Sequence, residues 1–191
     1  MSCELGLERN EVRLVPYNPE WKHEFERERA KIIPELKLQK EHLQHIGSTS
    51  IIHIKSKPVI DMLLGVDDLK SAVSLYEKGL RKHGYYRLRV QREAEIVFAK
   101  FKDEDFQIKT HYIHMVEWDG EKWKNLLHFR DYMNQFPESR REYENIKNSY
   151  VELNGCQGIS EYTEHKEQFV ENICKLREST AKTSDFHRNN V

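Results

Sequence analysis

Two neighbouring stretches of the sequence decide the fold: HIGSTS at His45–Ser50 and PVIDMLLGV at Pro58–Val66. The second stretch is a near-continuous apolar run, which is typical of a strand buried on both faces of a sheet. The first is the end of a short strand, 42–46, that runs into a turn of small residues. We expect the two strands to lie side by side, so that the turn and the buried strand open onto one site.

Asp61 is the one charge inside the apolar run. A buried carboxylate is costly unless it is paired, hydrogen-bonded or bound to a metal. The functional interpretation is that Asp61 binds a divalent metal, Mg²⁺ or Mn²⁺. The structural alternative is an ion pair with a neighbour such as Lys57, and the residues themselves leave both open.

The turn after the first strand combines a glycine with three hydroxyl residues. Gly47 allows the backbone to approach a ligand closely, and Ser48, Thr49 and Ser50 offer hydroxyls and amides that can cradle phosphate oxygens. The same composition is also that of an ordinary turn. Lys57, at the mouth of the buried strand, is our preferred cation for the phosphates.

The rest of the chain predicts further strands followed by helices alone. Alternating or apolar runs indicate strands over 11–15, 85–90, 96–101 and 106–116, with helices after Asn18 and from Leu69 to Gly84. From Asp119 onward the periodicity is helical only. We therefore predict an α/β (α+β) fold with a mixed sheet, flanking helices and a C-terminal helical region. The expected division is an N-terminal extension over 1–10, a core over 11–118, a helical region packed on it over 119–177, and a flexible tail over 178–191.

Composition excludes several classes of protein. The 191 residues contain 31 Lys and Arg against 32 Asp and Glu, so no overall basic field exists to gather nucleic acid or an anionic membrane. The three cysteines are widely spaced, which argues against a disulfide framework or a zinc site. No apolar window is long enough for a membrane span. We expect a cytoplasmic protein, and the oligomeric state is not predicted.

The order of strand, Gly-Ser, about a dozen residues and a strand carrying Asp resembles the nucleotidyltransferase superfamily. Several linked motifs extend this to a resemblance to the GrpB family, and they are Tyr17–Trp21, His45–Ser50, Lys57-Pro58, Ile60-Asp61, Thr110-His111 with His114, Phe129–Tyr132, and Tyr162 with Lys166. The resemblance implies a nucleotidyltransferase-like fold, an ATP-like nucleotide as ligand and a divalent metal. In that reading Asp61 and Ser48 are the catalytic residues.

The chain departs once from a typical catalytic nucleotidyltransferase, in a trait that the GrpB family resemblance shares, and once from the GrpB family itself. Residues i and i+2 of a strand share a face and usually supply two metal carboxylates, but the i+2 position here is Leu63. The family's common Val-Pro-Gly is replaced by Ile51–His53. Three functions stay open: transfer of a nucleoside monophosphate to an unknown hydroxyl acceptor, nucleotide binding without catalysis, and a hydrolytic or other metal-dependent reaction that uses Asp61 with His114.

Later side chains could complete the site. His114 could serve as the missing metal ligand, which would favour Mn²⁺ over Mg²⁺, whereas His111 should point to the opposite face. Arg130, Lys147 and Lys166 lie beside apolar helical stripes and could reach the phosphate tail. The alternative for these three is a solvated side chain, or for Arg130 a local ion pair with Asp131.

Overall fold

A computed structural model describes the chain over residues 4–90, 92 and 94–188, with side chains described as far as Arg177. Its five-stranded mixed sheet has the order β1-β2-β5-β4-β3. The strands are listed in chain order: β1 Leu43–Ile46, β2 Ile60–Val66, β3 Tyr85–Arg87, β4 Ile96–Phe101 and β5 Lys109–Glu117. β2 and β5 are parallel, and the other pairs are antiparallel. The predicted fold class and the pairing of the first two strands are confirmed.

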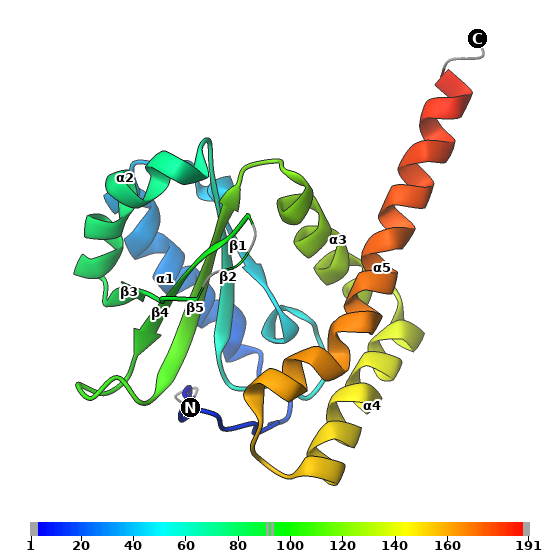
Figure 1. The fold of residues 1–191 in the computed structure, drawn as a ribbon, viewed down its shortest axis with the longest axis horizontal. Helices are drawn as coiled ribbons and strands as arrows, with labels where there is room; N and C mark the ends of the chain where they lie inside the picture. The colour runs from blue at the N-terminus through cyan, green and yellow to red at the C-terminus, as the bar shows by residue number, and fades with distance from the viewer. Residues whose placement is uncertain (1–3, 91, 93, 189–191) are drawn as a thin grey trace.

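Two helices cover one face of the sheet: α1 (Glu20–Leu36) and α2 (Leu69–Lys82) (Figure 1). The Asn18 side chain accepts a hydrogen bond from the Glu20 amide at 2.9 Å, as an N-cap does. Trp21 and Phe25 of α1 pack with every second side chain of β2, including Met62 and Leu64, to form the largest core cluster. The strand period of two therefore sends Asp61 and Leu63 to the other face.

The C-terminal region is helical, as predicted. It consists of α3 (Glu121–Gln135), α4 (Pro137–Asn154) and α5 (Ile159–Arg188), which lie together on one side of the sheet in Figure 1. Trp123 of α3 packs on Leu63 and Val116 of the sheet, so this helix joins the two parts of the molecule. A second cluster holds α3, α4 and α5 to Ile51 and Ile54 of the loop before β2.

One sequence expectation needs correction. The segment 11–15 is not a strand, because Glu11 bridges to Gln157 while Val15 bridges to Ser56, and two different partners cannot continue one ladder. The expected N-terminal extension packs on the sheet at Leu7, which is buried and pairs with Lys109. The alternating apolar residues of 11–15 are explained by contacts with the helical region at Gln157 and with the loop before β2 at Ser56.

The expected tail over 178–191 is helical in part. The backbone is helical through residues 178–188 as the end of α5, which continues a helix that is already formed, and continuing a helix costs less than starting one. Its predicted flexibility stays a prediction, and 189–191 lie outside the described residues. Within the described part of the chain, no helix is both long enough and apolar enough to cross a membrane.

Candidate functional site

The glycine turn touches the half-buried carboxylate of Asp61, as predicted. Gly47 has φ of 68°, and a Cβ built on it would lie 2.5 Å from Asp61 Oδ2. Any other residue would both strain the backbone and collide with Asp61. Because Ile46 pairs with Asp61 across β1 and β2, the sheet register places the turn directly beside the carboxylate.

The three hydroxyls of the turn have different roles. Ser50 Oγ donates to the Gly47 carbonyl at 2.7 Å, and buried Thr49 contacts His45 Nε2 at 3.0 Å. These two side chains therefore hold the turn in shape. Ser48 Oγ instead lies 3.2 Å from the Tyr143 hydroxyl of α4, which links the turn to the helical region.

The partner of Asp61 is His114. His114 Nε2 lies 3.4 Å from Asp61 Oδ1, and its Nδ1 lies 2.5 Å from Glu95 Oε1. Burial alone would lower the pKa of His114, but hydrogen bonds and charge from Asp61 and Glu95 raise it to about 9. Burial raises the pKa of Asp61, yet the pKa is lowered overall, chiefly by His114. The ring is an imidazolium that donates to both carboxylates.

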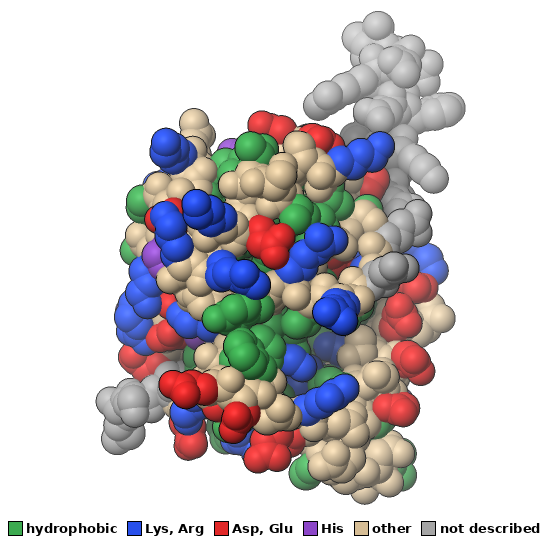
Figure 2. Space-filling view, turned by 60° about the vertical axis from the view of Figure 1, so that its left-hand side comes forward, with side chains coloured by type: hydrophobic (Ala, Val, Ile, Leu, Met, Phe, Trp, Pro, Cys, Tyr) green, Lys and Arg blue, Asp and Glu red, His purple; other side chains and the backbone are tan. Residues whose placement is uncertain are grey.

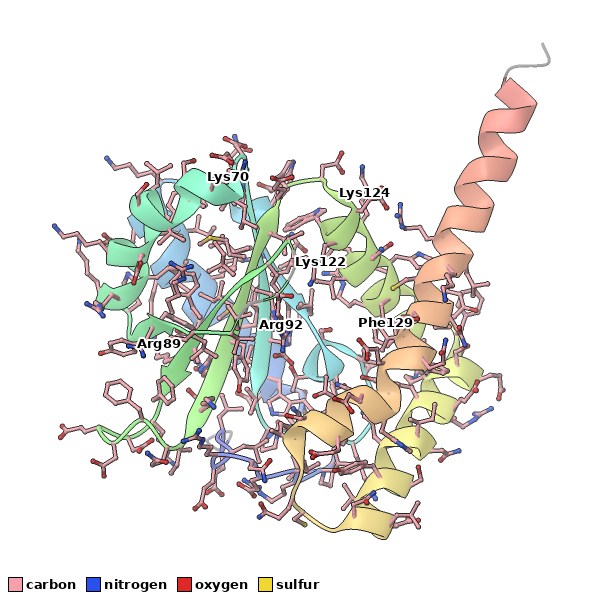
Figure 3. All side chains as sticks on the ribbon, viewed as in Figure 1. Lys70, Arg89, Arg92, Lys122, Lys124 and Phe129 are labelled. Carbon is pink, nitrogen blue, oxygen red and sulfur yellow. The ribbon has the colours of Figure 1, made fainter. Side chains whose placement is uncertain are left out.

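Glu95 is a site residue that sequence analysis did not identify. Its side chain is buried and also pairs with Lys122 at 2.5 Å and with Arg92 at 3.3 Å. Figure 3 shows Arg92 and Lys122 close to each other in front of the sheet. Burial raises the pKa of Glu95, but His114 and Lys122 bring it down to about 2. Glu95 is thus a fully ionised anchor for His114.

The two predicted metal ligands, Asp61 and His114, lie next to each other, and a metal there stays a prediction. Asp61 and Glu95 sit at opposite nitrogens of one imidazole ring, so a metal on a single ring nitrogen of His114 could not also bind both carboxylates. Among the described residues no group of three His, Cys, Asp or Glu side chains could hold a metal ion. His111 points to the other face, toward Glu24 of α1 at 3.4 Å, as predicted.

Lys147 is the most unusual charge in the molecule. Its side chain is 0% exposed, and its Nζ donates to the Lys55 carbonyl and lies 4.8 Å from the centre of the Tyr143 ring. Burial lowers the pKa of Lys147 to about 7, and repulsion from Lys166 and Lys57 adds to the effect. A buried ammonium without a counter-ion is expensive, so the position calls for an anion.

Two further lysines lie at the same place. Lys57 Nζ lies 5.3 Å and Lys166 Nζ 5.1 Å from the centre of the Tyr162 ring. Burial lowers the pKa of Lys57 to about 8, with further lowering by the charge of Lys166. None of the ion pairs between described residues includes Lys57, Lys147 or Lys166. These three residues form what is called here the lysine cluster.

Tyr162 connects the lysine cluster to Asp61. It is almost fully buried, and burial raises the pKa of its hydroxyl, with smaller contributions from Tyr143 and Asp61. Asp61 in turn stabilises the charge on Lys57. The lysine cluster, two tyrosines, Ser48 and Asp61 therefore form one site, and its elements are the turn, β2, α4 and α5.

The contacts of Arg130 are structural, as in the alternative of a local ion pair with Asp131. Its guanidinium pairs with Asp131 at 2.7 Å and donates to Gln44 Oε1 and to the His45 carbonyl, both at 3.2 Å. Those bonds tie α3 to β1. A phosphate role for Arg130 stays a prediction, but the contacts in the structure are to the protein itself.

Exposed charge does not single out this site. Figure 2 shows Lys and Arg side chains spread over one face between apolar and acidic ones. The sequence feature that does mark the site is a repeated spacing of Tyr and Lys. Tyr143 and Lys147 are four residues apart, as are Tyr162 and Lys166, and residues at this spacing share one face of a helix. The Tyr-x-x-x-Lys pattern on two helices could have identified both tyrosines from sequence.

The fold and this site define a class, an α/β protein whose mixed sheet meets a helical region at a cluster of lysines. The family model described as GrpB protein matches residues 11–176. Glutamate-rich protein GrpB of Alkalihalophilus pseudofirmus is 39% identical over 170 residues, covering 88% of this chain and 97% of that protein. The chain belongs to the GrpB family.

Other relatives agree with this assignment. YqkA of Bacillus subtilis is 30% identical over 96% of this chain, which spans only 51% of YqkA. The crystal structure of GrpB from Enterococcus faecalis matches with a TM-score of 0.72 and 26% identity, covering 85% of this chain and 95% of that one. A structure of Cid1 poly(U) polymerase matches at a TM-score of 0.47 and 11% identity, covering 72% of this chain and 41% of that one, a likeness too slight to bear on function.

Proposed function

We propose that the protein binds the polyphosphate tail of an ATP-like nucleotide at the lysine cluster. The observation that carries the proposal is Lys147, a fully buried cation without a carboxylate partner among the described residues. Folding gives this charge a backbone acceptor and the nearby charge of Glu144 but no ion pair, and a bound anion would supply one. Selection for stability alone would favour an apolar residue at such a position.

The composition of the site favours phosphate over other anions. Three ammonium groups and the hydroxyls of Ser48, Tyr143 and Tyr162 offer many donors within one site. A single carboxylate could not use them all, whereas a chain of phosphates carries several charges and many acceptor oxygens. Gly47 and Ser48 supply the turn that the nucleotidyltransferase resemblance associates with a nucleotide phosphate.

The test is calorimetric titration of ATP into three proteins. Lys147→Met removes the buried charge and keeps the side-chain length, and we expect its affinity for ATP to fall at least about tenfold, the scale of one lost charged contact. Lys78→Met, on the exposed face of α2, is the matched control and should bind as the wild type does. Equal ATP affinity for wild type and Lys147→Met would refute the proposal.

Transfer of a nucleoside monophosphate to a hydroxyl acceptor is the second candidate. The observation that favours it is the contact of Asp61 with Gly47, which puts a carboxylate beside the proposed phosphates. In this reading Asp61 accepts the proton of the acceptor hydroxyl and Ser48 orients a phosphate. Release of pyrophosphate from ATP that is lost in Asp61→Asn would support transfer. Absence of pyrophosphate release by the wild type with a panel of hydroxyl acceptors would leave binding as the function.

A further inference from the structure

We infer that this site binds polyphosphate without a divalent metal, because the protein's own cations occupy the place where a metal would neutralise the phosphates. The inference rests on the proposed function and deepens it. Three observations carry it: Asp61 and Glu95 lie on opposite sides of one histidine ring, no ion pair between described residues includes a lysine of the cluster, and the lysines lie away from solvent.

The first observation is the pairing of the carboxylates. Asp61 and Glu95 lie on His114 from opposite sides of its ring, at 3.4 and 2.5 Å. Glu95 is further held by Lys122 and Arg92. A metal could reach Asp61 only through Oδ2, the oxygen beside Gly47, and Glu95 would remain on the far side of the His114 ring. The geometry that gives nucleotidyltransferases two carboxylates on one metal is absent from these residues.

The second observation is the surplus of positive charge beside Asp61. Burial is the main cause that lowers the pKa of Lys57 and of Lys147, and repulsion from the other lysines of the cluster lowers both further. Glu144 lies near Lys147 and offsets part of its repulsion, but its carboxylate accepts from the Lys55 amide at 2.5 Å. The lysine cluster can therefore supply the charge that Mg²⁺ supplies elsewhere.

The third observation is distance from solvent. Lys147 is fully buried and Lys57 is half-buried, so their charges are screened less than those of surface lysines. Charges interact more strongly where water screens them less. A free divalent cation that enters beside these ammonium groups is therefore repelled, whereas a phosphate is attracted.

The experiment compares titrations of ATP and of inorganic triphosphate in EDTA and in excess Mg²⁺ or Mn²⁺. We expect both ligands to bind in EDTA, with an affinity equal to or greater than that measured with metal. Binding that appears only with Mg²⁺ or Mn²⁺ would overturn the inference and leave the proposed function intact. No binding under either condition would refute the proposed function itself.

A variant series makes the assignment specific. Lys166→Met removes a partly buried ammonium over the Tyr162 ring and should weaken triphosphate binding at least fivefold, equally in EDTA and in Mg²⁺. His114→Gln removes the cation from Asp61, and we expect Mn²⁺ then to strengthen triphosphate binding, because Asp61 is free to join a metal. His114→Gln that folds yet binds triphosphate as the wild type does, with no response to Mn²⁺, would overturn the role given to His114.

Discussion

Glu28 of α1 and Lys147 of α4 are both fully buried charged side chains, but their surroundings differ. Glu28 has a complete set of partners: Lys31 and Lys100 each lie 2.8 Å from its carboxylate, and the Tyr85 hydroxyl donates to it at 2.7 Å. Lys147 has a backbone carbonyl and the face of a tyrosine ring. One charge is satisfied by the fold, and the other is not.

The pKa values express the same difference. Burial raises the pKa of Glu28, but its three partners lower it to about 2, so the charged form is strongly favoured. Burial lowers the pKa of Lys147 to about 7, so the charged form is disfavoured. A satisfied buried charge stabilises the fold, whereas an unsatisfied one is a candidate for ligand binding. The comparison therefore separates structural from functional charges without reference to any relative.

Removal of the satisfied charge should have the largest effect. Glu28→Gln leaves Lys100 and Lys31 without their carboxylate, and we expect a loss of about 3 kcal/mol in the free energy of unfolding, the low end for a buried pair because both lysines reach solvent. Denaturant unfolding measures the loss. ATP affinity should be unchanged, and a stability equal to that of the wild type would contradict the contrast drawn here.

Removal of the unsatisfied charge should have the opposite sign. We expect Lys147→Met to raise the free energy of unfolding by about 2 kcal/mol at pH 7, since a buried charge is replaced by an apolar side chain of similar length. Lys78→Met, measured in the same denaturant series, should stay within about 0.5 kcal/mol of the wild type. A large loss of stability in Lys147→Met would show that Lys147 is a structural anchor.

The pH dependence of stability is a further test of the contrast between Glu28 and Lys147. The pKa of Lys147 falls from 10.5 in the unfolded chain to about 7 in the folded one, so between these pH values the unfolded state binds more protons. Stability of the ligand-free protein should therefore rise from pH 7 toward pH 9, by at most about 1.4 kcal/mol per pH unit for this group. ATP affinity should fall over the same range as the ammonium is lost. Lys147→Met should show a flatter stability profile, and identical profiles would exclude Lys147 as the titrating group.

The smallest effect is expected at Arg130. Arg130→Gln loses the hydrogen bonds to Gln44 and to the His45 carbonyl, which should cost about 1 kcal/mol of stability, as expected for hydrogen bonds at a half-buried position. ATP affinity should stay within twofold of the wild type in calorimetry. A tenfold loss of affinity without loss of stability would restore Arg130 as a phosphate ligand.

Most of the fold could be predicted from sequence, since it depends on local patterns. The apolar run of Ile60–Val66 and the helical periodicity after Asp119 identified the buried strand and the helical region. The strand predicted over 11–15 was wrong because alternating apolar residues indicate only that one side of a segment is buried. They do not identify the part of the molecule that buries it. The helical backbone of 178–188 was not predicted because this segment has no apolar periodicity, the pattern that indicated the earlier helices.

The site could be predicted only in part. The Gly47 contact with Asp61 followed from two motifs that flank neighbouring strands. Glu95 could not be identified, because it lies in a polar stretch without periodicity and reaches the site only through β4 and β5. Lys147 was named as a candidate, but its complete burial depends on the packing of Tyr143 and the loop at Lys55, which no local pattern encodes.

A crystal structure of the protein grown with inorganic triphosphate in EDTA tests the central claim most directly. The account predicts a phosphate oxygen within about 3 Å of Lys147 Nζ, the usual reach of a charged hydrogen bond, with Lys57 and Lys166 on the same anion. A triphosphate bound elsewhere, with Lys147 still donating only to the Lys55 carbonyl, would contradict it.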